Sequence, residues 1–310
     1  MRIISDDFII DLKEGMLHPL LNRVKKDDTL MLAIREGYVN IYYRGGNILR
    51  LRELNNQNYK AEFDSNYNIV GKTMPNLPDY IKSSEDIQKW IEAIPFLKEL
   101  MDFYFSAHPK SEREFQQLVA RENNKSSISN QSEYFIADIE YADSGNAARF
   151  DMLAIRWLAT QRKKGEYCKP AFIEMKYSDS ALEGESGLLK HLKDLDAFIA
   201  NKDQYEKVIQ TMSEQFQILD SLGLIQFNKG KSNAIVQLDT NDKPEIIFII
   251  ANHNPRSKKL KNIINNPRFN EYANSKHFDL RFFVASFAGY GMHADCMLTL
   301  EEFSNLLDAR

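Results

Sequence analysis

An acid and a lysine stand two positions apart inside one apolar segment, Ala171-Phe172-Ile173-Glu174-Met175-Lys176-Tyr177. The apolar neighbours predict a buried β-strand, and side chains two apart on a strand point to the same face. A carboxylate and an ammonium are costly to bury unless they are paired or bound to a ligand. We therefore expect Glu174 and Lys176 to belong to an active site. The alternative is a surface strand that carries a simple ion pair.

A second acid stands near the head of the preceding apolar segment, Arg149-Phe150-Asp151-Met152-Leu153-Ala154-Ile155. A long basic connection, Gln161-Arg162-Lys163-Lys164-Gly165, follows it, so the two segments are predicted to be neighbouring strands. Two carboxylates on adjacent strands can bind Mg²⁺ through oxygen. A lysine beside them can orient a metal-bound water or stabilise charge on a phosphate. The alternative for Asp151 is a turn residue at the start of a strand.

Asp151, followed one strand later by Glu174-Met175-Lys176, resembles the D…(D/E)-x-K signature of the PD-(D/E)XK nuclease superfamily. The elements expected over residues 111–290 are similar in order to that family's core. The resemblance implies that Asp151, Glu174 and the backbone carbonyl of Met175 hold Mg²⁺, with Mn²⁺ as a substitute, and that Lys176 is the catalytic lysine. It also implies metal-assisted hydrolysis of phosphodiester bonds, with DNA favoured over RNA as the substrate, in restriction, phage defence or repair.

The same family often carries one more acid on its first core helix. Some relatives place a Glu directly after the aromatic residue of that helix, whereas this chain has Gln116 there. Either Glu112, one turn earlier on the same face, takes the role of the acid, or Gln116 serves by hydrogen bonding. Acids in a first helical turn also have a purely structural explanation, because they compensate the helix dipole. The proline of the family name is absent as well, since Phe150 precedes Asp151.

The helix expected after the Glu-x-Lys strand, over residues 186–200, carries two weak candidates for nucleic-acid contact. Lys190 and His191 lie beside its apolar stripe and could reach a phosphate. A lysine in this setting is more often solvated, and a histidine is more often a satisfied core residue. Both alternatives stay open.

Other polar residues have plain structural explanations. Asp138 and Glu140 stand two apart on the first expected core strand; they could add acidity to the site, but a solvated face is the expected placement. His253 follows a buried strand, where α/β proteins often carry function, but an Asn-Pro turn after it explains the segment equally well. The basic run over 256–261 fits phosphate contact or a charged helix face.

The rest of the chain must position these residues. In the first third we expect a helix over 8–24, a four-stranded antiparallel meander over 28–35, 38–44, 47–54 and 59–64, a linker over 73–78, and a helix over 85–105 bent or broken near Pro95. Beyond it we expect strands over 134–141, 149–157, 171–177, 245–251 and 280–287, and helices from 111 and over 186–200, 204–222, 258–264 and 300–307.

These elements predict an α+β protein. Its restriction-endonuclease-like core would consist of a helix, a mixed central sheet and flanking helices, preceded by an antiparallel β module. The expected domains are a β-meander module over 1–72, a linker and helix over 73–110, and a nuclease-like domain over 111–310.

Composition sets limits on the function. The chain has 310 residues, a net charge of −4 and 43% hydrophobic residues, values typical of a globular protein and incompatible with disorder. It has neither a bilayer-spanning apolar run nor a secretory signal, so no membrane is expected. Two cysteines exclude a disulfide scaffold and a four-cysteine zinc site, and favour the cytoplasm. The negative charge does not exclude a local basic groove.

Two other functions remain open. The chain could be a catalytically inactive member of the nuclease fold that acts as a binding or assembly module, or an interaction protein whose meander binds a protein partner. Tyr38, Tyr42, Tyr43 and Arg44 fit base stacking or packing, and tyrosines in strands usually pack, so no site is assigned there. A homodimer would suit double-strand cleavage.

Overall fold

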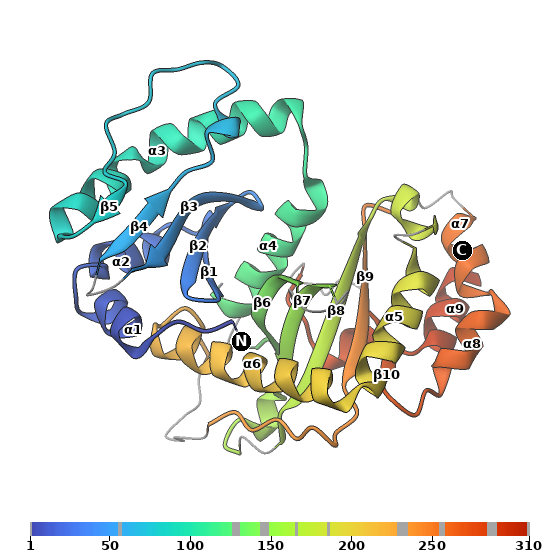
Figure 1. Ribbon diagram of the computed structural model, residues 1–310. Helices are drawn as coiled ribbons and strands as arrows, with labels where there is room; N and C mark the ends of the chain where they lie inside the picture. Colours follow the sequence, from blue (N-terminus) through green and yellow to red (C-terminus); the bar gives the residue numbers. More distant parts are fainter. Residues whose placement is uncertain are drawn as a thin grey trace. The chain divides into compact units, whose positions relative to one another are not determined.

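A computed structural model of the chain describes residues 2–54, 58–125, 131–142, 149–164, 167–184, 187–227, 235–253, 258–283 and 290–308. The chain divides into two compact units, Met1–Arg121 with Ile218–Ile225, and Glu122–Gln217 with Gln226–Arg310. Residues 73–110, expected as a linker and helix between domains, lie within the first unit. One unit holds an antiparallel sheet and the other a mixed sheet, so the expected α+β class is confirmed (Figure 1).

The sheet of the first unit has its strands in sequence order. They are β1 (Leu30–Arg35), β2 (Tyr38–Tyr43), β3 (Gly46–Glu53), β4 (Tyr59–Glu62) and β5 (Tyr80–Ile81), each antiparallel to the next. The predicted meander is confirmed and extended by β5, which was too short to predict. The helix expected over 8–24 is two helices, α1 (Asp6–Lys13) and α2 (His18–Lys26). Pro19 lies in the first turn of α2, where its fixed φ suits the helix and its missing N–H costs no helical bond.

Alternation of side chains gives this sheet one apolar face. The residues of that face are buried: Leu32, Ile34, Val39, Ile41, Leu49, Leu51, Tyr59, Ala61 and Ile81. Helix α2 contacts β1, and α3 (Ser84–Ala107) contacts β3 and β5. The core of the unit therefore lies between the sheet and these helices.

Helix α3 runs unbroken through Pro95, so a break at this residue is wrong, while a bend there stays a prediction. Ser83 caps the helix by accepting a hydrogen bond from the N–H of Asp86. Pro95 lies on the exposed side, while Ile94 and Leu97 beside it are buried. Packing of the buried side thus holds the helix together across the hydrogen bond that proline cannot make.

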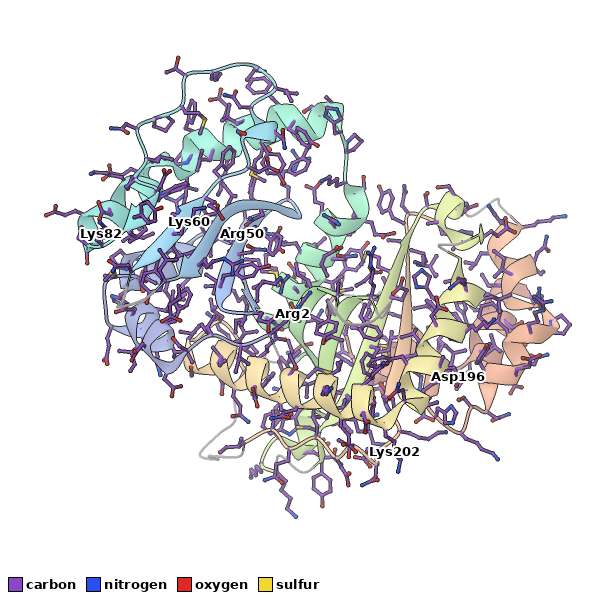
Figure 2. The ribbon with its side chains drawn as sticks, in the orientation of Figure 1. Arg2, Arg50, Lys60, Lys82, Asp196 and Lys202 are labelled. Atoms are coloured by element: carbon purple, nitrogen blue, oxygen red, sulfur yellow. The ribbon has the colours of Figure 1, made fainter. Side chains whose placement is uncertain are left out.

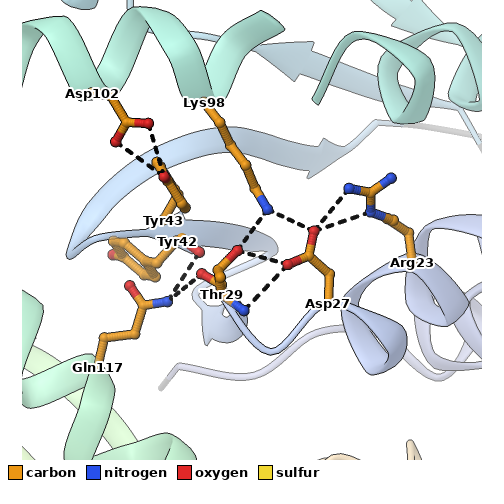
Figure 3. A network of polar contacts seen from close by, with 8 residues as sticks. All are labelled: Arg23, Asp27, Thr29, Tyr42, Tyr43, Lys98, Asp102 and Gln117. Atoms are coloured by element: carbon orange, nitrogen blue, oxygen red, sulfur yellow. Dashed lines mark hydrogen bonds and ion pairs between the residues drawn. The ribbon is translucent and has the colours of Figure 1, made fainter. Parts of the chain in front are cut away.

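A polar network joins α2, the start of β1 and α3 (Figure 3). The Asp27 carboxylate accepts from Arg23 at 2.8 Å and from the Lys98 ammonium at 2.6 Å, and it also accepts from the hydroxyl of Thr29. Burial opposes ionisation of Asp27, but the bonds from Lys98, Thr29 and Arg23 outweigh it and hold the pKa of this carboxyl well below its usual range.

The second unit is built on a mixed six-stranded sheet of order β11-β10-β9-β8-β7-β6. Its strands are β6 (Tyr134–Ala142), β7 (Arg149–Arg156), β8 (Lys169–Tyr177), β9 (Glu245–Ala251), β10 (Asp279–Phe283) and β11 (Met297–Leu298). Strands β6, β7 and β8 are antiparallel, β8, β9 and β10 are parallel, and β11 is antiparallel to β10. The five predicted core strands are confirmed, although residues 284–287, expected to end β10, lie outside the described residues.

The helices of this part of the chain follow the expected order. They are α4 (Ser111–Asn124), α5 (Leu188–Ala200), α6 (Lys202–Ser221), α7 (Lys259–Ile264), α8 (Pro267–Ala273) and α9 (Leu300–Asp308). Helices α4 and α6 each contribute residues to both units. Helix α8 was not predicted. It contacts α5 and β10 and covers one end of the mixed sheet together with α9.

Candidate active site

Glu174 and Lys176 lie on β8, a central strand of the mixed sheet, between β7 and β9. They are only 4% and 3% exposed, and the Lys176 ammonium lies 2.7 Å from Oε1 of Glu174. A surface strand with a solvated ion pair is therefore excluded for these two residues. A buried acid and a buried lysine that neutralise each other are costly to maintain and are typical of functional sites.

Asp151 lies on β7 beside the Glu-x-Lys segment. The paired ladder of β7 and β8 ends at Met152 and Ile173, so Asp151 and Glu174 are the next residue on each strand. Oδ2 of Asp151 accepts a hydrogen bond of 2.8 Å from the backbone N–H of Met175. The Asp151 carboxylate is thus held against the backbone between Glu174 and Lys176, and the structure brings the three predicted residues together.

Helix α5 adds His191 to this cluster. Nδ1 of His191 lies 3.0 Å from the same Glu174 oxygen that contacts Lys176. Two turns further along α5, the Phe198 ring packs 6.0 Å from the ring of Phe172, which shares a face of β8 with Glu174. This aromatic contact fixes α5 over the strand and so positions His191.

His191 is neutral at physiological pH. Burial, followed by the nearby Lys176 cation, lowers the pKa of His191 to about 4. A neutral imidazole can donate to a carboxylate through an Nδ1–H group, so the contact with Glu174 is best described as a hydrogen bond rather than an ion pair. The expected contact of His191 with a phosphate stays a prediction.

The donor atoms at this site suit a hard cation. Asp151 and Glu174 supply carboxylate oxygens, and Met175 between them supplies a backbone carbonyl. Across the described ranges, no cluster of three or more His, Cys, Asp or Glu could hold a metal ion. Mg²⁺ does not need such a cluster, because it is commonly held by one or two carboxylates, water and substrate phosphates. The residues present therefore fit Mg²⁺ better than zinc, which prefers nitrogen and sulfur ligands.

The remaining predicted site residues lie on helices α4 and α5. Glu112 and Gln116 are on the part of α4 that belongs to the first unit, so their role at the site stays a prediction. Gln116 is 1% exposed, and neither atom of its amide has a hydrogen-bond partner within the described residues. Lys190 forms an ion pair with Asp194 on an exposed part of α5, and its contact with nucleic acid is likewise untested.

The solvated face expected for Asp138 is wrong. Asp138 is buried on β6, where it accepts from the backbone N–H of Ile139 at 2.8 Å and from Gln215 at 3.4 Å. The register of β6 against β7 shifts between Ile136 and Asp138, and Glu140 has a φ of 50°. These irregularities break the simple alternation on which the prediction relied.

Sequence reasoning missed a carboxylate–histidine pair at the carboxyl ends of β8 and β9. Oδ1 of Asp179 lies 2.7 Å from Nδ1 of His253, and the backbone of Ser178 bonds to Ala251 just before them. The position of Asp179 directly after an apolar strand was the signal available. The Asn254-Pro255 turn and residues 256–257 of the basic run, which entered the prediction for this segment, lie outside the described residues.

A second buried acid lies at the opposite end of the same strands. Glu245 pairs with Ala171 in the parallel ladder of β8 and β9, and its carboxylate accepts from Tyr134 at 2.7 Å and from Arg156 at 2.8 Å. Both partners come from the antiparallel strands β6 and β7. This cluster links the two halves of the sheet and has a structural role.

No helix among the described residues is long and apolar enough to cross a membrane. Comparison of the chain with protein-family models, with curated proteins and with solved structures finds no match.

Proposed function

We propose that the chain is a metal-dependent nuclease that hydrolyses phosphodiester bonds, with DNA as its substrate, and that its second unit is a restriction-endonuclease-like core. One observation carries the proposal. Glu174 and Lys176 are buried 2.7 Å apart on a central strand, and the Asp151 carboxylate is bonded to the backbone between them.

Each residue has a role in this proposal. Asp151, Glu174 and the Met175 carbonyl hold Mg²⁺ or Mn²⁺, which when bound supplies a Lewis acid and a more acidic water. Lys176 orients the attacking water and stabilises negative charge on the phosphate. Neutral His191 holds the Glu174 carboxylate in place by hydrogen bonding.

A second candidate is a nucleic-acid-binding module with the same fold but no catalysis. Two observations favour it. Gln116 replaces the helix acid found in some members of the resembled family. The contacts of Glu174 with Lys176 and His191 also satisfy this carboxylate without a metal.

Calorimetry with Mn²⁺ tests the proposal, followed by a cleavage screen on DNA and RNA. The variants are Asp151→Asn, whose amide oxygen still accepts from Met175, together with Glu174→Gln and Lys176→Met. Asp194→Asn on the exposed part of α5 is the matched control. We expect the first two variants to lose Mn²⁺ binding, and all three to lose at least about 100-fold in cleavage, with the control unchanged.

Three outcomes decide between the functions. Unchanged cleavage in Asp151→Asn and Lys176→Met would overturn the proposed site. Binding of nucleic acid without metal-dependent cleavage in the unaltered protein would favour the binding module. Binding of neither metal nor nucleic acid would favour the protein-interaction function.

A further inference from the structure

The sheet of the first unit carries a row of basic and aromatic side chains on the face opposite its core. Tyr38 pairs with Arg52 across β2 and β3, Arg52 with Lys60 across β3 and β4, and Lys60 with Tyr80 across β4 and β5. Residues directly opposite one another share a face of the sheet. Arg50, two residues before Arg52, lies on the same face. We call these five residues the basic–aromatic face.

This face is accessible. Arg52 is exposed, the side chain of Lys60 is 42% exposed, and Tyr80 is 51% exposed. Tyr38 and Arg50 are partly exposed. Figure 2 labels Arg50 on β3 and Lys60 on β4, the strand next to it. The basic and aromatic side chains of this face are therefore in contact with solvent. The opposite face of the same sheet packs against the apolar core.

The guanidinium groups of this face lie against an aromatic ring, and Arg50 also donates a hydrogen bond to Asn40. The guanidinium carbons of Arg50 and Arg52 lie 5.2 and 4.5 Å from the centroid of the Tyr38 ring. Neither arginine forms an ion pair with any residue in the described part of the chain. Lys60 forms an ion pair with Glu62 at 2.7 Å, and Glu62 stands opposite Arg50 across β3 and β4, so this acid accompanies three cations on the face. The face is positive in a chain whose net charge is −4.

The positive charges and the planar tyrosine and guanidinium groups of this face together indicate which kind of ligand it binds. Cations attract phosphates, and each neutralised phosphate releases counterions. Aromatic rings and guanidinium planes stack on bases, which are available for stacking only where they are unpaired. A duplex would use the charges but not the exposed Tyr80 ring, and an acidic peptide would use neither ring as a stacking surface.

We propose that the basic–aromatic face binds single-stranded nucleic acid. That the bound nucleic acid is also the substrate of the site on β8 rests on the proposed nuclease function. The binding of nucleic acid by the basic–aromatic face does not, because it requires no metal and no cleavage.

Fluorescence anisotropy tests the proposal with a labelled oligothymidylate of about 16 nucleotides. The full chain carries Asp151→Asn to block cleavage. Arg50→Gln with Arg52→Gln removes two cations from the face, and Tyr80→Ala removes the exposed ring. Lys13→Gln with Lys89→Gln, at exposed helical positions, is the charge-matched control. Thermal unfolding checks that each variant is folded.

We expect the double arginine variant to bind at least tenfold more weakly and to reduce the slope of log K against log salt by about 1.4, at about 0.7 per phosphate contact. Tyr80→Ala should lose about tenfold by the loss of one stacked base, while the control keeps its affinity. Equal binding by the arginine variant and the control would overturn the proposal, as would failure of the Asp151→Asn protein to bind the oligonucleotide.

Two further outcomes distinguish binding of a single strand by base stacking from purely electrostatic binding, and this inference from the proposed nuclease function. Equal affinity for duplex and single strand, insensitive to Tyr80→Ala, would overturn the stacking role, and so would full competition by polyglutamate. If the unaltered protein cleaves nothing but the face still binds oligothymidylate through Arg50 and Arg52, the nuclease function fails and this inference stands.

Discussion

Two neighbouring glutamines on α4 have opposite surroundings. Gln117 receives a hydrogen bond of 2.8 Å from the N–H of Gly45 and donates one of 2.9 Å to the carbonyl of Thr29. Gln116 is also buried, yet its amide makes no hydrogen bond to the described residues. A buried polar group without partners lowers stability, and one with partners raises it.

Replacing each glutamine by leucine separates these cases. We expect Gln116→Leu to raise the free energy of unfolding by about 1 kcal/mol, because an unsatisfied amide is removed. Gln117→Leu should lower it by about 2 kcal/mol, because Gly45 and Thr29 lose their partner. Urea unfolding measures both. A loss in Gln116→Leu as large as that in Gln117→Leu would show that the Gln116 amide is satisfied in solution.

The two cysteines differ in access to reagents. Burial raises the pKa of Cys168 to about 12 and leaves the side chain with no exposed surface, whereas Cys296 is partly exposed. Because the thiolate is the reactive form, we expect a disulfide reagent at pH 8 to label Cys296 slowly and Cys168 only after unfolding. Cys296→Ser supplies the control. Rapid labelling of this variant in its native state would contradict the burial of Cys168.

At the scale of residues, the sequence predicted the site residues whose signal lies in their immediate neighbours along the chain. Glu174 and Lys176 were recognisable because charged side chains interrupt an apolar strand. The bond of His191 to Glu174 and that of His253 to Asp179 were not, since each joins residues distant in sequence. Only the packing of α5 on β8, and the parallel pairing of β8 with β9, bring these partners together.

At the scale of elements, long apolar segments were predicted well and short ones were missed. Strand β9, over Glu245–Ala251, was predicted to the residue because it is continuously apolar. Helix α8 has clear signals, namely an Asn266 cap and Pro267 at its start, but it is only 7 residues long. Strand β11 has two residues and is defined only by its pairing with β10.

Pro95 in α3 is expected to lower the free energy of unfolding, although packing keeps the helix continuous. A proline in a helix interior is about 3 kcal/mol less favourable than alanine, and removing it frees the unfolded chain by up to about 1 kcal/mol. We therefore expect Pro95→Ala to raise the free energy of unfolding by about 2 kcal/mol. Pro75→Ala, in a loop, should not raise it. A loss of stability in Pro95→Ala would mean that α3 is shaped around its proline.

At the scale of the whole molecule, the hydrogen bonds and ion pairs of Asp27 make the free energy of unfolding depend on pH. The pKa of Asp27 is lowered in the folded protein, so its contribution is complete above the usual carboxyl pKa near 4 and is lost as the pH falls toward the folded value. Asp27→Asn should cost about 2 kcal/mol at pH 7, because Lys98 and Arg23 lose a charged acceptor.

Unfolding measured from pH 7 to pH 2 checks this sign. The difference between the unaltered protein and Asp27→Asn should shrink below about pH 4. Asp28→Asn, at the exposed neighbouring residue, is the control and should have little effect at any pH. A constant difference across the range would mean that the cost comes from packing rather than from the charge.

The central position of β8 in its sheet also determines at which stage of synthesis and folding the candidate site forms. Its partner on one side, β7, precedes it closely in the chain, whereas β9 on the other side follows only after α5 and α6. Pairings between distant segments form late in folding, and a chain emerging from the ribosome folds from its N-terminal end. Until β9 is synthesised, Glu174 and Lys176 therefore lie on an unprotected edge strand. Maturation of the candidate site is thus coupled to the synthesis of β9, rather than to that of β7 and β8 alone.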